Sequence, residues 1–306
     1  MKLSVVSPVY NGASFLEELI VRIKKNVPSD FDKLEIILVD DYSPDGSWSA
    51  IESLSAIHEE VYGYKLSRNF GQHFAIMAGL SKATGDYVVV LDCDLQDQPE
   101  EIPRLYKKLQ EGYHAVVARR YDRKDGFLKK LFSRAFYRTL SYLTGTNQDA
   151  TVANFGIYSK AVIQEVVNLP EKIKFFPNMV KWVGFERGEL DVEHAARTEG
   201  KSNYNIRKLI NLAIDVILAY SNKPLRLIVK FGITIALVSF LMAIATFIMK
   251  LSGNIIVSGY ASLIVSIWFL SGCILITLGI LGLYIGKIFD SVKDRPIFII
   301  EKQTKK

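Results

Sequence analysis

The sequence of 306 residues is long enough for one sizeable domain with a smaller appendage. Its net charge of +6, from 38 basic and 32 acidic residues, is a mild excess that makes nucleic acid a poor candidate partner. Much of the positive charge lies in residues 119–138 and beside the apolar C-terminal segments, which favours a membrane surface or a phosphate-bearing substrate. The two cysteines, Cys93 and Cys273, lie in unrelated contexts, so we expect no disulfide and a reducing compartment. The strand-like start gives no sign of a cleaved signal peptide.

Short apolar runs alternate with helical patterns through the first half of the chain. We expect strands at residues 3–9, 34–39, 62–66, 87–91, 114–118 and 152–159. We expect helices near residues 13–25, 47–58, 72–83, 99–110, 127–144 and 161–169. This alternation predicts an α/β domain with a mixed, mostly parallel sheet and helices on both faces.

The run of apolar residues 87–91 predicts a strand buried on both faces, and it ends at Asp92 and Asp94. Because alternate side chains of a strand point to one side, both carboxylates can face one spot beyond the sheet, where open α/β sheets bind ligands. Two carboxylates with an open position suit Mg²⁺ or Mn²⁺ completed by the phosphates of a ligand. The simpler alternative is a polar loop that follows a buried strand.

Polar residues also follow the other expected strands. Tyr10 and Asn11 follow the first strand, Asp40 and Asp41 follow the second, and Arg68 follows the third. Four successive polar strand ends indicate one shared cleft. The sequence contains neither G-x-G-x-x-G after the first strand nor G-x-x-x-x-G-K-[ST], so the phosphates of a bound nucleotide would need a metal ion.

The C-terminal part is strongly apolar, and residues 231–249 and 251–286 carry no charge. A helix needs about 20 apolar residues to cross a bilayer, so we expect spans at residues 227–249 and 261–285. Basic residues flank the two runs on their outer sides, and the connection offers only Lys250, which predicts a cytoplasmic domain and tail. A buried hairpin of a soluble protein is the alternative.

Residues 204–220 repeat apolar side chains at helical spacing and begin with Arg207 and Lys208. This pattern predicts a helix that lies in the membrane interface or packs on the soluble domain, and its place before the first span favours the interface.

Taken together, the chain resembles the family 2 glycosyltransferases of GT-A fold, and within them the polyprenyl-phosphate glycosyltransferases. This group includes dolichol-phosphate mannose synthase and bacterial enzymes that act on undecaprenyl phosphate. The resemblance covers nearly the whole chain and rests on residues 7–11, 39–47, 68–73, 91–96 and 200–204, followed by two C-terminal spans.

The resemblance implies four parts. Residues 1–202 would form a cytoplasmic GT-A catalytic domain, 203–224 an interfacial helix, 225–288 a transmembrane hairpin and 289–306 a basic cytoplasmic tail. The protein would lie in the bacterial inner membrane with both termini in the cytoplasm, and its membrane helices could assemble into a homo-oligomer.

The resemblance also implies roles for single residues. Pro8, Tyr10 and Asp40 would hold the base and ribose of a nucleotide sugar, with Asn11, Asp41 and Arg68 in the same nucleotide-sugar site. Asp92 would lie near the ribose and sugar, Asp94 would coordinate the Mg²⁺ or Mn²⁺ on the diphosphate, and Gln96 would approach the donor sugar. Arg120 and Arg134 would hold the acceptor phosphate, and Lys201 and Arg207 would add charge at the membrane face.

One position departs from the family. Many relatives carry an aspartate where this chain has Asn154, which cannot accept a proton at neutral pH. A lipid phosphate is already largely dianionic at pH 7, so it needs positioning rather than a base, which matters for an alcohol acceptor. Asp149 is a second candidate for the missing carboxylate.

We therefore expect metal-dependent, inverting transfer of one sugar from a nucleotide sugar, with a UDP-sugar as the expected donor, to undecaprenyl (polyprenyl) phosphate at the cytoplasmic face of the membrane. Three alternatives remain open. A processive polysaccharide synthase would carry a Q-x-x-R-W segment, which this sequence lacks. A haloacid-dehalogenase-type phosphatase would carry its D-x-D after the first strand. A membrane-anchored sugar-nucleotide-binding protein without catalysis would account for Asn154.

Overall fold

The computed structural model describes residues 1–120, 142, 152–172, 174–192, 221, 223–251, 259–293 and 295–305. The chain divides into two compact units. The first, here called the sheet unit, comprises Met1–Arg134, Asp149–Asn203 and Arg295–Lys306, and the second, the helical unit, comprises Ala135–Gln148 and Tyr204–Asp294.

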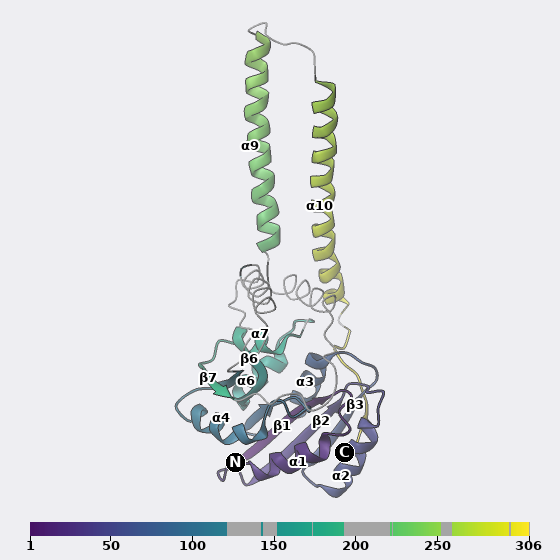
Figure 1. Ribbon diagram of the computed structural model, residues 1–306, viewed down its shortest axis with the longest axis vertical. Coiled ribbons are helices and arrows are strands. Elements are labelled where there is room, and N and C mark those ends of the chain that lie inside the picture. The colour runs from purple at the N-terminus through teal and green to yellow at the C-terminus, as the bar shows by residue number, and fades with distance from the viewer. Residues whose placement is uncertain are drawn as a thin grey trace. The chain divides into compact units, whose positions relative to one another are not determined.

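The described residues of the sheet unit form one mixed sheet with the order β7-β5-β6-β4-β1-β2-β3-β8 (Figure 1). β1 lies between β2 and β4 and is parallel to both, β2 is parallel to β3, and β5 is parallel to β7. β6 is antiparallel to β4 and β5, and β8 is antiparallel to β3. The strands are β1 Lys2–Val9, β2 Lys33–Asp40, β3 Val61–Leu66, β4 Tyr87–Val90, β5 Ala115–Arg120, β6 Val152–Ser159, β7 Arg187–Val192 and β8 Ile300–Gln303.

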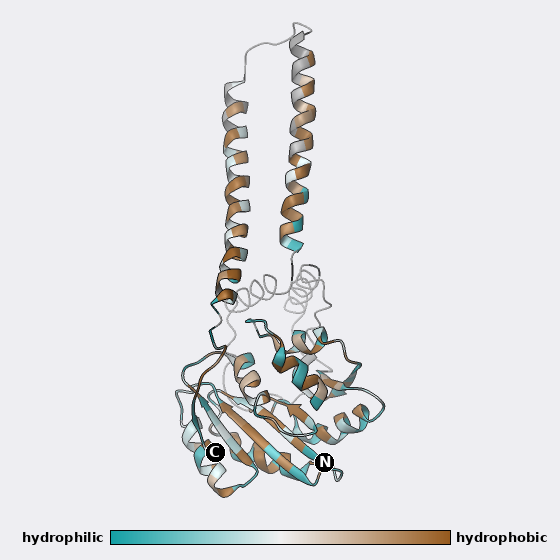
Figure 2. Ribbon diagram, turned by 180° about the vertical axis from the view of Figure 1, so that it is seen from behind, coloured by the Kyte–Doolittle hydropathy of each residue, from teal (hydrophilic) through white to brown (hydrophobic). Residues whose placement is uncertain are grey.

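Helices cover both faces of this sheet, as the sequence predicts. One face packs against α1 (Leu16–Lys25), α2 (Ser47–Ile57) and α4 (Ile102–Leu109), with the 3₁₀ turn η1 (Pro99–Glu101) before α4. The other face packs against α3 (Gln72–Leu80), α6 (Lys160–Asn168) and α7 (Phe176–Trp182). The central strands are therefore buried on both faces over most of their length, and most of their residues are hydrophobic (Figure 2).

Side chains alternate between the two layers along β1. Val5 of β1 belongs to the cluster under α1, while the neighbouring Val6 belongs to the cluster under α3. A Cβ on Gly79, near the C-terminal end of α3, would lie 2.4 Å from Cγ1 of Val6, so only glycine lets α3 sit this close to β1. This contact sets the distance between α3 and β1.

Three elements were not expected from the sequence. β7 carries three charged residues among six, so it shows no apolar run, and β8 is a short edge strand with mostly exposed side chains. α7 has seven residues and begins at Phe176, directly before a proline. The expected helix at residues 72–83 ends earlier, at Leu80, and the expected strand at residues 114–118 extends to Arg120.

The segment that follows the second long helix returns to the sheet. β8 pairs with β3, and the Ser67 amide donates to the Ile299 carbonyl at 2.9 Å. The Gly63 amide donates to Oγ1 of Thr304 at 2.9 Å, and the Thr304 amide donates to the Gly63 carbonyl at 3.0 Å. A Cβ on Gly63 would lie 2.8 Å from Cγ2 of Thr304 and 2.2 Å from Cγ2 of Ile51, so this contact requires glycine. The segment expected as a basic tail, residues 289–306, thus contains a strand of the sheet.

The helical unit contains two long helices, α9 (Lys223–Leu251) and α10 (Tyr260–Val292), which are hydrophobic along most of their length (Figure 2). The stretches Lys223–Met242 and Ser266–Phe289 are long and apolar enough to cross a membrane, and neither is buried inside the protein. The hydroxyls of Thr234 and Thr277 donate to the carbonyls of Lys230 and Cys273 at 2.9 and 2.8 Å, so these polar groups are satisfied within their own helices.

The expected helix at residues 127–144, apart from Tyr142, and the expected interfacial helix at residues 204–220 lie outside the described residues.

Candidate active site

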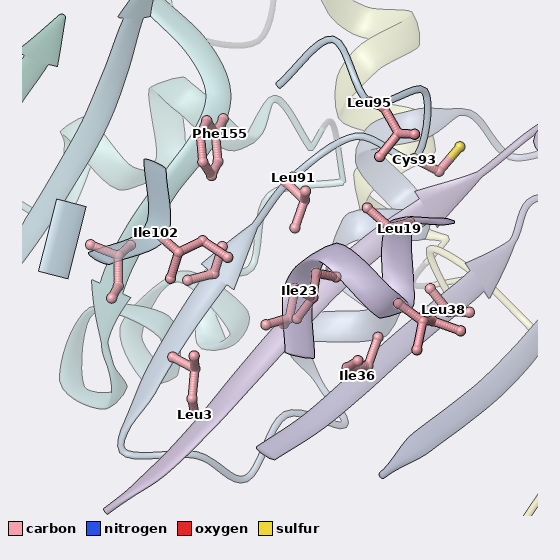
Figure 3. Close-up of a cluster of buried hydrophobic side chains, with 14 of the residues drawn as sticks. Leu3, Leu19, Ile23, Ile36, Leu38, Leu91, Cys93, Leu95, Ile102 and Phe155 are labelled. Carbon is pink, nitrogen blue, oxygen red and sulfur yellow. The ribbon is translucent and has the colours of Figure 1, made fainter. Parts of the chain in front are cut away.

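Burial alternates along residues 91–99, which follow β4. The odd-numbered side chains are buried, and Leu91, Cys93 and Leu95 among them belong to the hydrophobic cluster of Figure 3. The even-numbered side chains are polar and half-buried until the exposed Glu100: Asp92, Asp94, Gln96 and Gln98. Asp92 and Asp94 therefore face away from the core, as the alternation in the sequence predicts.

Cys93 anchors this loop to the loop after β1. A Cβ on Gly12 would lie 2.8 Å from Sγ of Cys93, so the two loops are in direct contact. Burial raises the pKa of the Cys93 thiol to about 12, which keeps it protonated at neutral pH. Cys93 is therefore a packing residue between the two acids and has no thiolate to offer as a nucleophile.

The backbone is strained at the carboxyl ends of the central strands. Among the described residues, those other than glycine with positive φ are Asn11 (55°), Tyr42 (57°) and Leu95 (59°). They follow β1, β2 and β4, which are neighbours in the sheet. Side chains with a Cβ disfavour this conformation, and such outliers concentrate at functional sites. The strained residues thus lie at the same carboxyl ends of the strands as the polar residues.

Asp40, the last residue of β2, is fully buried. Its Oδ1 accepts a hydrogen bond from the Ser43 amide at 3.0 Å, while its buried Oδ2 has no partner among the described residues. Burial is the main cause that raises the pKa of the Asp40 carboxyl, and the Ser43 hydrogen bond and Lys65 oppose it. A buried carboxylate oxygen without a partner is costly, so Asp40 is suited to a ligand that brings an N–H or O–H donor.

Asp41 is also buried, but both of its oxygens are used inside the protein. Its Oδ1 accepts from the Phe70 amide at 2.7 Å, and its Oδ2 accepts from the Gly71 amide at 2.9 Å. Burial raises the pKa of the Asp41 carboxyl, against the effect of these two hydrogen bonds. Asp41 therefore holds the loop that leads from β3 into α3. Of the two adjacent acids, Asp40 keeps a buried oxygen without a partner among the described residues.

The loop after β1 is fixed by the turn after β2. Pro8 is buried in β1, while Tyr10 and Asn11 are exposed beyond it. The Asn11 amide donates to Oγ of Ser43 at 3.2 Å, and the Ala13 amide donates to Oδ2 of Asp45 at 3.2 Å. These side-chain contacts to a distant loop leave no local signal in the sequence.

Asn154 lies in β6 beside the paired acids. Val90 pairs with Gly156, Asp92 follows Val90 by two residues, and Asn154 precedes Gly156 by two. Since β4 and β6 are antiparallel, Asn154 lies on β6 toward the end of β4 after which Asp92 follows, and both side chains are half-buried. The structure thus brings Asn154 to the same strand end as Asp92.

The basic residues are placed only in part. Arg68 is exposed, with its guanidinium 4.2 Å from the ring centre of Phe70. Arg119 is bound to Asp191 by two hydrogen bonds of 2.6 and 3.0 Å, which assigns it to the packing of β5 on β7. Arg120 is the last residue of β5, and only its backbone is described. Arg134, Lys201 and Arg207 lie outside the described residues, so their expected roles stay predictions.

The acids fit a divalent metal that binds together with a ligand. Within the described part of the chain, no group of three or more His, Cys, Asp or Glu side chains could hold a metal by itself. Asp92 and Asp94 supply two carboxylates at one strand end, and Mg²⁺ is typically held by one or two carboxylates plus substrate phosphates. The donor set therefore fits Mg²⁺ or Mn²⁺ bridged to a diphosphate.

Comparison with known proteins decides the family. The model of "Glycosyl transferase family 2" matches residues 4–168. The chain belongs to glycosyl transferase family 2.

Relatives that match this chain over nearly its full length are also sugar transferases by name. An undecaprenyl-phosphate 4-deoxy-4-formamido-L-arabinose transferase from Proteus mirabilis is 36% identical over 98% of this chain and 93% of its own length. A bactoprenol glucosyl transferase from Shigella phage SfV is 38% identical over 100% of both chains. The transferase class expected from the sequence is thus confirmed.

Solved structures confirm the fold. Glucosyl-3-phosphoglycerate synthase from Mycobacterium tuberculosis, in complex with phosphoglyceric acid, aligns with a TM-score of 0.52 at 19% identity. The alignment covers 72% of this chain and 78% of the synthase. The same synthase with Mn²⁺, UDP-glucose and phosphoglyceric acid also gives a TM-score of 0.52, at 18% identity over 71% and 78% of the two chains.

Proposed function

We propose that this glycosyltransferase moves one sugar from a UDP-sugar to undecaprenyl phosphate, with inversion at the anomeric carbon, on the cytoplasmic face of the bacterial inner membrane. The observation that carries the proposal is the joint presence, on one chain, of a metal-compatible acid pair at the strand ends and two membrane-length apolar helices. Relatives that match the full length are named for transfer to undecaprenyl phosphate or bactoprenol, which supports the same acceptor here.

The proposed recognition of uracil rests on Asp40, whose carboxylate favours a base with an N–H donor over cytosine. Its buried Oδ2 needs a hydrogen-bond donor, and the Watson–Crick edge of uracil presents one at N3. Cytosine presents only an acceptor at this ring position, so it would leave the carboxylate unpaired. Tyr10 is exposed beside this site, where its ring can stack on the base, and the fold neighbour solved with UDP-glucose and Mn²⁺ is consistent with this donor class.

The chemical step fits a phosphate acceptor. An oxygen of the lipid phosphate attacks the anomeric carbon from the face opposite the UDP, and the bond to the diphosphate oxygen breaks. Asn154 is suited to this step, because a phosphate dianion carries no proton that must be removed and an amide adds no negative charge to repel it. Asp92 and Asp94 would hold Mg²⁺ or Mn²⁺, which supplies charge stabilisation for the leaving diphosphate. Arg120 and Arg134 would balance the charge of the acceptor phosphate.

The proposed membrane side rests on charge and on the chain path. The basic residues Lys223, Arg226 and Lys230 lie at the start of α9, and Lys293 and Arg295 follow α10. An excess of Lys and Arg marks the cytoplasmic side. β8 follows both helices and pairs with β3, so the chain must return to the side from which it left, which two crossings achieve.

The test is a donor screen with the purified full-length protein in detergent or nanodiscs. UDP-, GDP- and dTDP-sugars are each incubated with undecaprenyl phosphate and Mg²⁺ or Mn²⁺, and lipid-linked product is detected by mass spectrometry. We expect one UDP-sugar to give a lipid-phosphate monosaccharide, and chelation of the metal to stop the reaction.

Two results would overturn the proposal. UDP binding without transfer from any donor would favour a binding protein that has lost catalysis. Asn154, which replaces the aspartate of many relatives, is the specific reason to consider this alternative. Lipid products with many added sugars would favour a processive synthase.

A further inference from the structure

Gln72, the first residue of α3, holds one of the two acids of the proposed metal site. Its side-chain amide Nε2 donates to Oδ1 of Asp92 at 2.7 Å. The two residues come from different elements, α3 and the loop after β4, and this hydrogen bond joins them across the strand ends. Neither the motif around Asp92 nor the helical pattern of α3 predicts the contact, and no role has so far been given to Gln72.

The position of Gln72 is fixed by the loop before it. Asp41 binds the amides of Phe70 and Gly71, and Gly71 has a φ of 106°, which a side chain with a Cβ would disfavour. α3 is also packed against β1 through Gly79. The amide of Gln72 is therefore presented to Asp92 by a backbone that is held on two sides.

The chemistry of the hydrogen-bond donor explains why residue 72 carries an amide. A lysine or arginine here would orient the carboxylate but would also place a positive charge where a metal must bind. An amide orients the carboxylate and leaves its negative charge available. Hydrogen bonds to metal-ligating carboxylates commonly serve this purpose, and their loss typically costs about 10- to 100-fold in metal affinity or activity.

We propose that Gln72 is a positioning residue that orients the Asp92 carboxylate toward the divalent metal that accompanies the bound UDP-sugar. The inference rests on the proposed function, because it takes Asp92 to be a ligand of the metal that accompanies the UDP-sugar. Gln72 acts through Asp92, and no contact with the substrate is required.

A matched control exists elsewhere in the same unit. Nε2 of Gln110 donates to Oδ2 of Asp30 at 3.2 Å, which is also a glutamine–aspartate hydrogen bond between separate elements, but it is exposed and involves none of the strand-end residues. Methionine has the length and helix propensity of glutamine without its hydrogen-bond donor. Gln72→Met and Gln110→Met therefore remove the same kind of bond at the two places.

The experiment measures Mn²⁺ binding by the full-length protein in the presence of saturating UDP, with calorimetry or the electron paramagnetic resonance of free Mn²⁺. UDP binding without metal and the melting temperature are measured in parallel. We expect Gln72→Met to weaken Mn²⁺ binding by about 10- to 100-fold, with metal-free UDP binding within twofold of wild type. Gln110→Met should leave Mn²⁺ binding unchanged. Gln72→Asn, whose side chain is shorter and cannot reach Asp92, should behave like Gln72→Met.

Several results separate the possibilities. Unchanged Mn²⁺ binding in both Gln72 variants would overturn the positioning role. Equal losses of metal-free UDP binding and of Mn²⁺ binding, with a lower melting temperature, would assign Gln72 to the structure of the loop instead and would also overturn it. If wild-type protein binds Mn²⁺ with UDP but transfers no sugar, the proposed function fails while the effect of Gln72 can still be read.

Discussion

Two pairs of acids in this glycosyltransferase follow β2 and β4, the strands on either side of β1, and their spacing separates their roles. Asp40 and Asp41 are consecutive, and both are buried where β2 meets the following loop. Asp92 and Asp94 are separated by the buried Cys93, and both are half-buried on one side of their loop. The side chains of consecutive residues in an extended chain point to opposite sides, whereas those of alternate residues point to the same side. We therefore propose that Asp41 holds the loop before α3, that Asp40 binds the donor base, and that Asp92 and Asp94 provide charge to the site.

Replacing each acid by the isosteric asparagine tests this division. The largest effect is expected for Asp94→Asn, because it removes a charge from the proposed metal site. Loss of a hydrogen bond to a ligand typically costs about 10- to 100-fold, so loss of the ligand itself should reduce turnover by more than about 100-fold. Turnover at saturating Mg²⁺ and the melting temperature are the measurements, and the latter should stay close to wild type. Wild-type turnover would contradict the metal assignment.

Asp40→Asn should weaken the binding of UDP and yet stabilise the protein. Loss of a charged acceptor, worth about 1.5–3 kcal/mol, corresponds to about 10- to 100-fold in affinity. Because burial raises the pKa of Asp40, the folded state favours the protonated acid, and stability is lost as the pH rises through the folded pKa. Asparagine does not ionise, so the melting temperature at pH 7.5 should exceed that of wild type.

The gain of the Asp40 variant should be smaller at a mildly acidic pH than at pH 7.5, because the raised pKa lets the wild-type carboxyl take up a proton as the pH falls. Thermal unfolding in detergent at the two pH values, with calorimetric titration of UDP, checks both parts. A lower melting temperature at pH 7.5 would mean that Oδ2 of Asp40 is satisfied inside the protein.

Asp41→Asn should have the opposite effect on stability. The amide nitrogen can no longer accept from a backbone N–H, so one of the Phe70 and Gly71 amides stays buried without a partner, at a cost of about 1–3 kcal/mol. We expect a lower melting temperature and a turnover loss smaller than that of Asp94→Asn. Denaturant unfolding of the two adjacent variants, Asp40→Asn and Asp41→Asn, gives the direct comparison, and equal shifts would remove the distinction between them.

Asn154→Asp adds a carboxylate near the strand end that carries Asp92 and Asp94, and it should have the smallest effect. A required general base would raise turnover by about 10²–10⁴-fold. We expect no gain and a modest loss instead, because the new charge repels the acceptor phosphate. The Michaelis constant for undecaprenyl phosphate should rise, and a large increase in turnover would show that this chain is limited by the missing base.

The sequence predicts the central strands and the D-x-D loop because both depend on local patterns. Residues 87–91 are apolar without interruption, and the alternation through Asp92 and Asp94 follows from the geometry of an extended chain. The sequence does not predict the contacts of Asp41, Ser43 and Gln72, because each reaches a backbone or side chain in another loop. Charged β7 and exposed β8 lack the apolar runs that identify buried strands, since an edge strand needs no such run.

The return of the chain to the sheet after α10 also sets an order of assembly. β8, Thr304 and Lys305 follow both long helices in the chain, and Lys305 donates to the carbonyls of His58 and Glu59, which follow α2, and of Val61, which begins β3. The ribosome therefore makes this edge of the sheet only after both hydrophobic segments. The sheet unit cannot be completed until α9 and α10 have been synthesised, so a chain truncated before residue 300 would lack β8 and the contacts of Lys305.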